Sequence, residues 1–200
     1  MTIDINNMLN TILEGVSKIE YIKTADIPNI PLYMDQVTSF IDGQLAGSKR
    51  NEDDKLLTKT MINNYTKNDL LPPPVKKKYS KEHLLSLIFI YYLKNILSIN
   101  DIHSVLKPIT EKYFGNKEGH DFEDIYAEIF RMEKEESTKL LKEFSKKHAI
   151  SKETFADFPE EDQNMLHAFS FICLLSFDVY MKKQLIEKIV DDVFSENEEA

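Results

Sequence analysis

Lysine, threonine and asparagine side chains gather in one short stretch of the chain, residues 59–79. Asparagine can form two hydrogen bonds with adenine, threonine can bond a base edge or a phosphate, and lysine neutralises phosphate charge. The stretch therefore has the side chains of a nucleic-acid-binding surface. The residues that we expect to contact DNA are Lys59, Thr60, Asn63, Asn64, Tyr65, Lys67, Lys76, Lys77, Lys78 and Tyr79.

A helix over residues 59–68 would position the first six of these residues. Thr58 can cap its N-terminus, and Met61, Ile62 and Tyr65 form an inner apolar face at helical spacing. The polar side chains then share the outer face. A solvated surface helix would show the same pattern, so the segments beside it must decide between the two interpretations.

The segment that follows is a proline stop and a lysine cluster. Pro72-Pro73-Pro74 ends the helix because proline lacks the N–H that a helix needs and clashes with the preceding turn. Residues 75–79 are then expected to form a short extended or hairpin segment. Three consecutive lysines on a stiff loop make a compact phosphate-binding surface. Directly after a polar helix, such a segment is typical of the wing of a winged helix-turn-helix.

Apolar helices flank this stretch. Tyr33–Ile41 predicts a short helix before it, and Ser80 is expected to cap a helix from Lys81 to about Leu97 after it. That second helix is apolar around most of its circumference, so it is expected to pack on more than one side. A further helix is predicted to begin with the capping box at Ser98 and to stop at Pro108.

The two ends of the chain also predict helices. Residues 5–22 form an amphipathic pattern, which fits a helix docked on the core or an oligomerising arm. Residues 122–130 carry a helical apolar stripe, and Pro159 begins a long helix that runs to about Val193. The middle of that helix, 166–181, is apolar nearly all round and must be surrounded by other helices or by a partner chain. Cys173 within it is expected to be a buried small hydrophobic residue.

Composition favours a helical protein with an uneven charge. Of 200 residues, 42% are hydrophobic and only five are glycine. The net charge is −9, yet residues 49–107 carry eleven Lys or Arg against six Asp or Glu, so +5, while the preceding segment is −4 and the following one −10. A basic middle in an acidic chain fits a local nucleic-acid interface.

Other functional classes lack their sequence features. The start of the chain has no signal-peptide pattern, and His167, Ser170, Ser176 and Asp178 interrupt the longest apolar region, so we expect a cytoplasmic protein without a membrane span. One cysteine excludes an intramolecular disulfide. The histidines show no metal-ligand spacing, and no catalytic or phosphate-loop motif occurs. We therefore expect no metal, no cofactor and no enzymatic activity.

The stretch from Leu57 to Leu106 resembles the winged helix-turn-helix of MerR-type regulators. The recognition-helix pattern of that family is similar to Met61-Ile62-Asn63-Asn64-Tyr65 closing on Asp69-Leu70-Leu71-Pro72, and its basic wing residue two before a tyrosine matches Lys77 and Tyr79. On this alignment the helix over Tyr33–Ile41 would be the first helix of the motif. Asn63 stands where the family has arginine, Asn64 where it has tyrosine, and the turn around Lys49–Lys55 is longer.

The chain also resembles an uncharacterised bacterial family, a domain of unknown function with a MerR-like head. LYMDQVTSFID, LTKTMINNYTK and LLPPP followed by KKKYS carry this resemblance, which covers about residues 30–106. It implies a transcriptional regulator that binds duplex DNA.

Together these patterns predict an all-α fold, a winged helix-turn-helix (MerR-like) head plus a C-terminal helical bundle. Residues 1–30 would be an amphipathic helix and linker, 31–107 the head, and 108–200 a dimerisation or effector region that forms a homodimer through its helices. The net charge of −9 and Asn63 support an alternative, a protein–protein interaction module that keeps the fold without binding DNA. A small-molecule effector rests only on aromatic residues in the C-terminal helices, which are expected to pack in the core.

Overall fold

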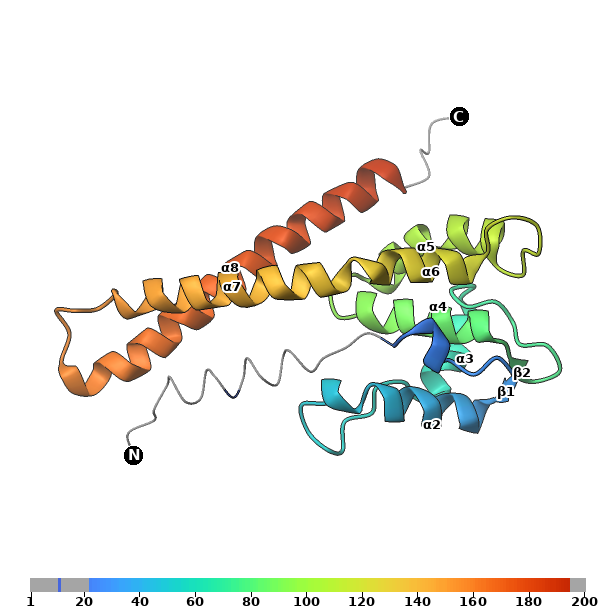
Figure 1. Cartoon of the computed structure of the whole chain (residues 1–200), viewed down its shortest axis with the longest axis horizontal. Helices are drawn as coiled ribbons and strands as arrows, with labels where there is room; N and C mark the ends of the chain where they lie inside the picture. Colours follow the sequence, from blue (N-terminus) through green and yellow to red (C-terminus); the bar gives the residue numbers. More distant parts are fainter. Residues whose placement is uncertain (1–10, 12–21, 195–200) are drawn as a thin grey trace. The chain divides into compact units, whose positions relative to one another are not determined.

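The computed structural model describes Thr11 and residues 22–194, and most of these residues are helical (Figure 1). This confirms the predicted all-α class. The described residues divide into two units, a head unit of residues 22–131 with 186–194 and a hairpin unit of residues 132–185. The predicted helix over residues 5–22 lies outside the described residues, apart from Thr11 and Ile22.

The head unit contains short helices and one two-stranded ladder. In chain order its elements are η1 (Thr24–Asp26), β1 (Leu32–Tyr33), α2 (Met34–Gln44), η2 (Ala46–Ser48), α3 (Lys59–Lys67), β2 (Lys78–Tyr79), α4 (Lys81–Leu93), α5 (Ile99–Tyr113), α6 (Phe122–Arg131) and the end of α8 (Glu160–Val193). The strands β1 and β2 pair antiparallel, with Leu32 opposite Tyr79 and Tyr33 opposite Lys78.

Helix α4 forms the centre of the head unit. Every residue from His83 to Tyr91 is buried, which confirms the prediction that this helix packs on more than one side. On one side the Phe89 ring meets α6, with its centroid 5.9 Å from that of Phe122 and 5.3 Å from that of Tyr126. Burying each large apolar side chain stabilises the fold by roughly 1.5–3 kcal/mol. The hairpin segment that precedes α4 is therefore attached to the best-packed element of the unit.

Helix α5 begins with the predicted capping box at Ser98, but the prediction that it stops at Pro108 is wrong. The helix continues through Pro108 to Tyr113. Proline removes one backbone N–H and costs about 3 kcal/mol in a helix interior. Ile109 and Tyr113 pack against the core of the head unit, and this tertiary packing offsets the local cost.

A buried hydrogen bond fixes the start of the head unit. The hydroxyl of Tyr126 in α6 donates to the backbone carbonyl of Ile22 at 2.6 Å, and both residues are buried. A buried tyrosine hydroxyl needs such a partner, because an unpaired one would lose its hydration without compensation. The bond therefore ties the segment before η1 to α6.

The hairpin unit consists of α7 (Glu133–Lys152) and the first part of α8, which run alongside each other (Figure 1). The Lys147 ammonium of α7 forms an ion pair with Asp178 of α8. The ring centroids of His148 and Phe171 lie 5.5 Å apart, and Nε2 of His167 lies 2.9 Å from the Thr154 carbonyl oxygen. These contacts join the inner sides of the two helices.

The outer side of α8 is exposed, and this corrects the prediction for Cys173, while the prediction that a partner chain surrounds the helix stays a prediction. Cys173 is exposed rather than buried. The middle of α8 packs on α7 along one side only, and apolar side chains on the other side are largely exposed. By length and composition α8 is a candidate membrane span, which is weak evidence because core helices of soluble proteins meet the same criteria. The cytoplasmic location stays a prediction.

Candidate nucleic-acid interface

Helix α3 carries six of the ten predicted DNA contacts, and local interactions fix both of its ends. Thr58 caps it as predicted, because its Oγ1 accepts the Met61 N–H at 3.2 Å. At the other end Asp69 adopts a positive φ of 59°, a conformation that glycine usually supplies at helix ends. The N–H groups of Leu70 and Leu71 then both bond the Tyr65 carbonyl, at 2.9 and 3.2 Å.

The two faces of α3 separate as the spacing predicts, with one exception. Ile62 and Tyr65 are buried, but Met61 is 37% exposed, so its assignment to the inner face is wrong. Burial reaches only the two residues that point most directly at the core. The exposed side chains of this helix include the predicted polar contacts Lys59, Thr60, Asn63, Asn64 and Lys67.

The lysine segment forms a hairpin with a two-residue turn, in agreement with its prediction as an extended or hairpin segment. Val75 and Lys78 exchange backbone hydrogen bonds of 3.1 and 3.0 Å. Between them Lys76 and Lys77 have φ angles of 51° and 64°. Two consecutive positive φ angles are those of a type I′ turn, where Asn-Gly is the preferred pair. Both lysines are exposed, as is Lys78.

Tyr65 and Tyr79, which the sequence places among the DNA contacts, are core residues of the head unit. Both are buried, and burial raises the pKa of each phenol. Burial places them in the core beneath the polar side chains, so they support the motif, and their direct contact with DNA stays a prediction.

Tyr33 is a contributor that the sequence did not reveal. The sequence predicts it as the first residue of the helix over Tyr33–Ile41, but it lies in β1 and is 53% exposed. The Lys78 ammonium lies 5.1 Å from the centre of its ring, within cation–π range. Only the strand register, with Tyr33 opposite Lys78, brings the two together. The pairing holds one lysine of the hairpin in place.

Lys59 has an unforeseen acidic partner. Its ammonium pairs with the carboxylate of Asp35, in the first turn of α2. Both side chains are well exposed, so the ion pair adds little stability. It does, however, reduce the positive charge at the start of α3. Helix α2 contacts both α3 and β2, and so links the two groups of candidate residues.

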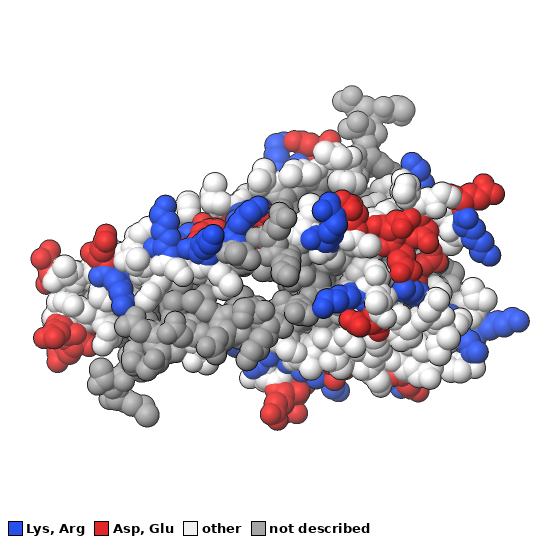
Figure 2. All heavy atoms as spheres, viewed as in Figure 1, with Lys and Arg blue, Asp and Glu red and all other residues white. Residues whose placement is uncertain are grey.

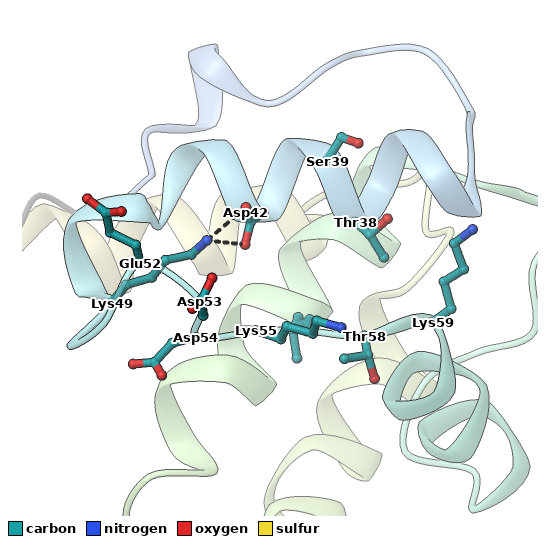
Figure 3. Close-up of a pocket in the computed structure, with 11 residues that line it drawn as sticks. Thr38, Ser39, Asp42, Lys49, Glu52, Asp53, Asp54, Lys55, Thr58 and Lys59 are labelled. Atoms are coloured by element: carbon teal, nitrogen blue, oxygen red, sulfur yellow. Dashed lines mark hydrogen bonds and ion pairs between the residues drawn. The ribbon is translucent and has the colours of Figure 1, made fainter.

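A cleft of about 510 Å³ lies beside the start of α3 (Figure 3). Three lysines and four acids line it, so its charges nearly cancel, and Lys49 pairs with Asp42 at 2.8 Å. Its lining residues are Thr38, Ser39, Asp42, Lys49, Glu52, Asp53, Asp54, Lys55, Leu57, Thr58 and Lys59. The arrangement does not favour an anionic ligand.

The loop along this cleft is braced by Asp54, whose carboxylate accepts the backbone N–H groups of Arg50 and Asn51 at 3.1 and 2.9 Å. The hydrogen bond from the Asn51 backbone, the largest of several contributions, lowers the pKa of Asp54. This explains how the long turn between α2 and α3 holds its shape.

Positive charge in the head unit is local. Figure 2 shows acidic and basic side chains intermingled over the visible face. The candidate interface is defined by particular side chains, those of α3 and of the hairpin. In the part of the chain that the structure describes, no three His, Cys, Asp or Glu side chains gather as metal ligands.

His83 joins the hairpin to α4. Its Nδ1 accepts the Ser80 backbone N–H at 3.0 Å, and its ring packs edge-on against Tyr79 and Phe114. Burial lowers the pKa of His83, and the carbonyl groups of Pro73 and Pro72 partly offset this. The neutral ring thus caps the helix, and protonation at Nδ1 would remove the bond to Ser80.

We expect the head unit to lose stability in mild acid through His83. Its pKa is lowered from 6.5 in the folded state, so the unfolded chain binds the proton more tightly. The contribution of His83 is complete above pH 6.5 and is lost as the pH falls from there through the lower folded pKa. Urea unfolding between pH 5 and 8 measures this dependence.

The matched variant for this experiment is His83→Gln. A glutamine can still accept the Ser80 N–H in a capping box, but it does not titrate. Its stability should therefore change less between pH 8 and 5 than that of the parent. The control is the same substitution at His148, a histidine of the hairpin unit whose pKa is also lowered mainly by burial. It shows how much of the acid dependence arises outside the head unit. If His83→Gln and the parent lose equal stability, His83 is not the acid-sensitive group.

A protein family whose activity is unknown matches the head unit of the chain. Residues 22–129 match the model of a family described as Domain of unknown function (DUF1836). No curated protein and no solved structure matches the chain. The matched range coincides with the head unit up to α6 and includes α3 and the lysine hairpin.

Proposed function

Because the chain belongs to the DUF1836 family, whose description assigns no activity, we propose from its own residues that the head unit binds duplex DNA as a transcriptional regulator. The observation that carries the proposal is the hairpin turn, where Lys76 and Lys77 both have positive φ. A residue other than glycine costs roughly 1–2 kcal/mol in this conformation. Strain of this kind persists mostly at functional positions.

The chemistry of the turn supports phosphate as its ligand. Lys76 and Lys77 are exposed at the tip of the hairpin, and the next lysine, Lys78, is held against Tyr33. An ammonium group that is already held in place, as that of Lys78 is, loses less side-chain entropy when it binds the backbone of a duplex. In this proposal the hairpin is the wing of a MerR-like winged helix-turn-helix.

Helix α3 supplies the second part of the proposal. Its exposed side chains include Asn63 and Asn64, which can read adenine in the major groove. Lys67 in the last turn would bond phosphate. The helix is short, and its caps and two buried residues hold it firmly against the head. It would enter the groove as the recognition helix of the motif.

Replacing the three hairpin lysines by alanine tests the proposal. The variant K76A/K77A/K78A should bind a fluorescein-labelled 30-base-pair duplex more weakly than the parent. The slope of log K against log salt should also become shallower, by up to ~0.9 for each phosphate that the variant no longer neutralises. Fluorescence anisotropy over a series of salt concentrations measures both quantities.

The control removes the same charge elsewhere. The variant K142A/K146A/K152A, in α7 of the hairpin unit, has the same change in net charge. It should bind the duplex like the parent. Equal losses of affinity in the two variants would mean that only net charge matters. Unchanged binding by K76A/K77A/K78A at every salt concentration would exclude residues 75–79 as a DNA-binding wing.

A second candidate function is a protein–protein interaction module that keeps the fold without binding DNA. The pairing of Lys59 with Asp35 favours it, because it reduces the positive charge of the proposed recognition helix. The same experiment separates the two functions. Parent protein that binds neither the labelled duplex nor genomic fragments at micromolar concentration and low salt supports the interaction module.

A further inference from the structure

The outer side of α8 in the hairpin unit forms an exposed apolar face. We define this face as Met165, Phe169, Ile172, Cys173, Phe177 and Tyr180, which recur at helical spacing. The five besides Cys173 are 57–65% exposed, and Cys173 is also exposed. From residue 163 to 181 the only charged side chain is Asp178, which pairs with Lys147 of α7 on the inner side.

The face is large enough for a stable interface. Its three aromatic side chains are 57–63% exposed, so at about 150–250 Å² for a fully buried aromatic side chain they would together remove roughly 270–450 Å² per protomer from water. The aliphatic side chains add to this, toward the roughly 800 Å² per partner of a standard interface. Soluble monomers rarely expose an apolar patch of this size.

Charges at the two ends of the face indicate its partner. Glu161 and Asp162 precede the apolar face, and Lys182 and Lys183 follow it. The midpoint between these acidic and basic pairs falls at Ile172, within one residue of the middle of the apolar face between Ile172 and Cys173. An antiparallel copy of the same helix would therefore place acidic ends beside basic ends and apolar side chains against one another.

We propose that the chain forms a homodimer in which the apolar faces of two α8 helices pack antiparallel, about a two-fold axis between Ile172 and Cys173. A two-fold interface requires a surface that is complementary to itself, and this face meets that condition in charge and in hydrophobicity. The face spans about 25 Å of helix at ~1.5 Å per residue.

A membrane fits the hairpin unit less well than a second copy does. A spanning α8 would carry Asp178 toward one end of the hydrocarbon region, at a cost of up to about 2.5–3.5 kcal/mol, the value for a carboxylate at the centre. Its ion-pair partner Lys147 belongs to α7, which is rich in charged residues. The dimer leaves this ion pair in place.

The first experiment measures the oligomeric state of the full chain. Light scattering after gel filtration should give twice the monomer mass of 23.3 kDa for the parent. Ile172→Lys should weaken association at least 100-fold, and Asn164→Lys should leave it unchanged. Asn164 is also exposed on α8 but lies outside the apolar face, so the two variants differ only in where the charge is added. Circular dichroism confirms that both remain helical.

The second experiment tests the antiparallel arrangement with cysteine, because Cys173 is the only cysteine of the chain. Mild oxidation should join two parent chains through Cys173, which lies beside the axis. In the double variant Cys173→Ser, Ser176→Cys, the new cysteine lies opposite residue 169 of the other copy. It is then about 10 Å along the helix from its equivalent, too far for a disulfide.

Each alternative has a distinct result that would overturn the proposal. Disulfide cross-linking of both the parent and the double variant indicates that the two helices pack in parallel. A monomer in which Cys173 resists a thiol reagent indicates that residues 5–19 of the same chain cover the face. A monomer with a reactive Cys173 that binds phosphatidylcholine vesicles indicates that the face binds a lipid surface. A monomer with a reactive Cys173 that does not bind vesicles indicates that the face has neither a second copy nor a lipid surface as its partner.

Discussion

Replacing Lys76 by asparagine and Lys77 by glycine should stabilise the head unit and weaken its binding to DNA at the same time. Asn-Gly is the preferred pair for a two-residue turn with positive φ at both positions, whereas lysine is strained there. Relief of that strain should raise the free energy of unfolding by ~1–2 kcal/mol. Removal of two ammonium groups should make the salt dependence shallower by up to ~1.8 in slope.

The variant K76A/K77A separates the two effects. Alanine removes the same charges but keeps a side chain at each strained position, so DNA binding should fall equally while stability should not rise. Urea unfolding and anisotropy of the same preparations give both quantities. If the Asn-Gly variant is no more stable than the alanine variant, the hairpin is not under the strain that we infer.

Replacing Asn63 and Asn64 by alanine should remove most of the sequence preference of the head unit. An asparagine that forms two hydrogen bonds with adenine contributes about 1–3 kcal/mol of discrimination between bases. The double variant should therefore bind a selected site roughly 10- to 10⁴-fold more weakly, depending on how many of the two asparagines read a base. Its affinity for a scrambled duplex should hardly change.

Lys67→Ala is the matched comparison for this prediction. Removing a lysine that bonds phosphate should lower the affinity for selected and scrambled duplexes by the same factor. Both substitutions lie on the exposed side of α3 and leave its two buried residues intact. Equal losses of affinity for both duplexes in the asparagine variant would assign α3 to phosphate binding and leave base reading to another element.

Local sequence signals were sufficient to predict the elements that carry the candidate interface. Thr58 and Ser80 each act on their immediate neighbours, so the starts of α3 and α4 were predictable, and the triple proline indicated that a non-helical segment separates the two helices. The burial of α4 was also predictable, because a helix that is apolar all round has no side suited to water. Whether these elements bind DNA is not a local property, and it stays a proposal.

The incorrect predictions concern residues whose state depends on distant segments. Pro108 stays helical because Ile109 and Tyr113 pack against the core, which no neighbouring residue reveals. Cys173 lies in an apolar sequence but on the side of α8 that faces away from α7. The turn at Lys76 and Lys77 could not be foreseen from residue type, because lysine is not a usual turn residue at positive φ.

The central position of α4 also sets an order of local opening. Buried helices with dense side-chain packing open only when a domain unfolds as a whole, whereas short exposed turns open at little cost. Through Ser80 and His83 the hairpin is joined to the element that should open last, whereas its tip is closed by the Val75–Lys78 bridge and exposed to solvent. We therefore expect the tip to open at a small free-energy cost while the base stays closed in the native state.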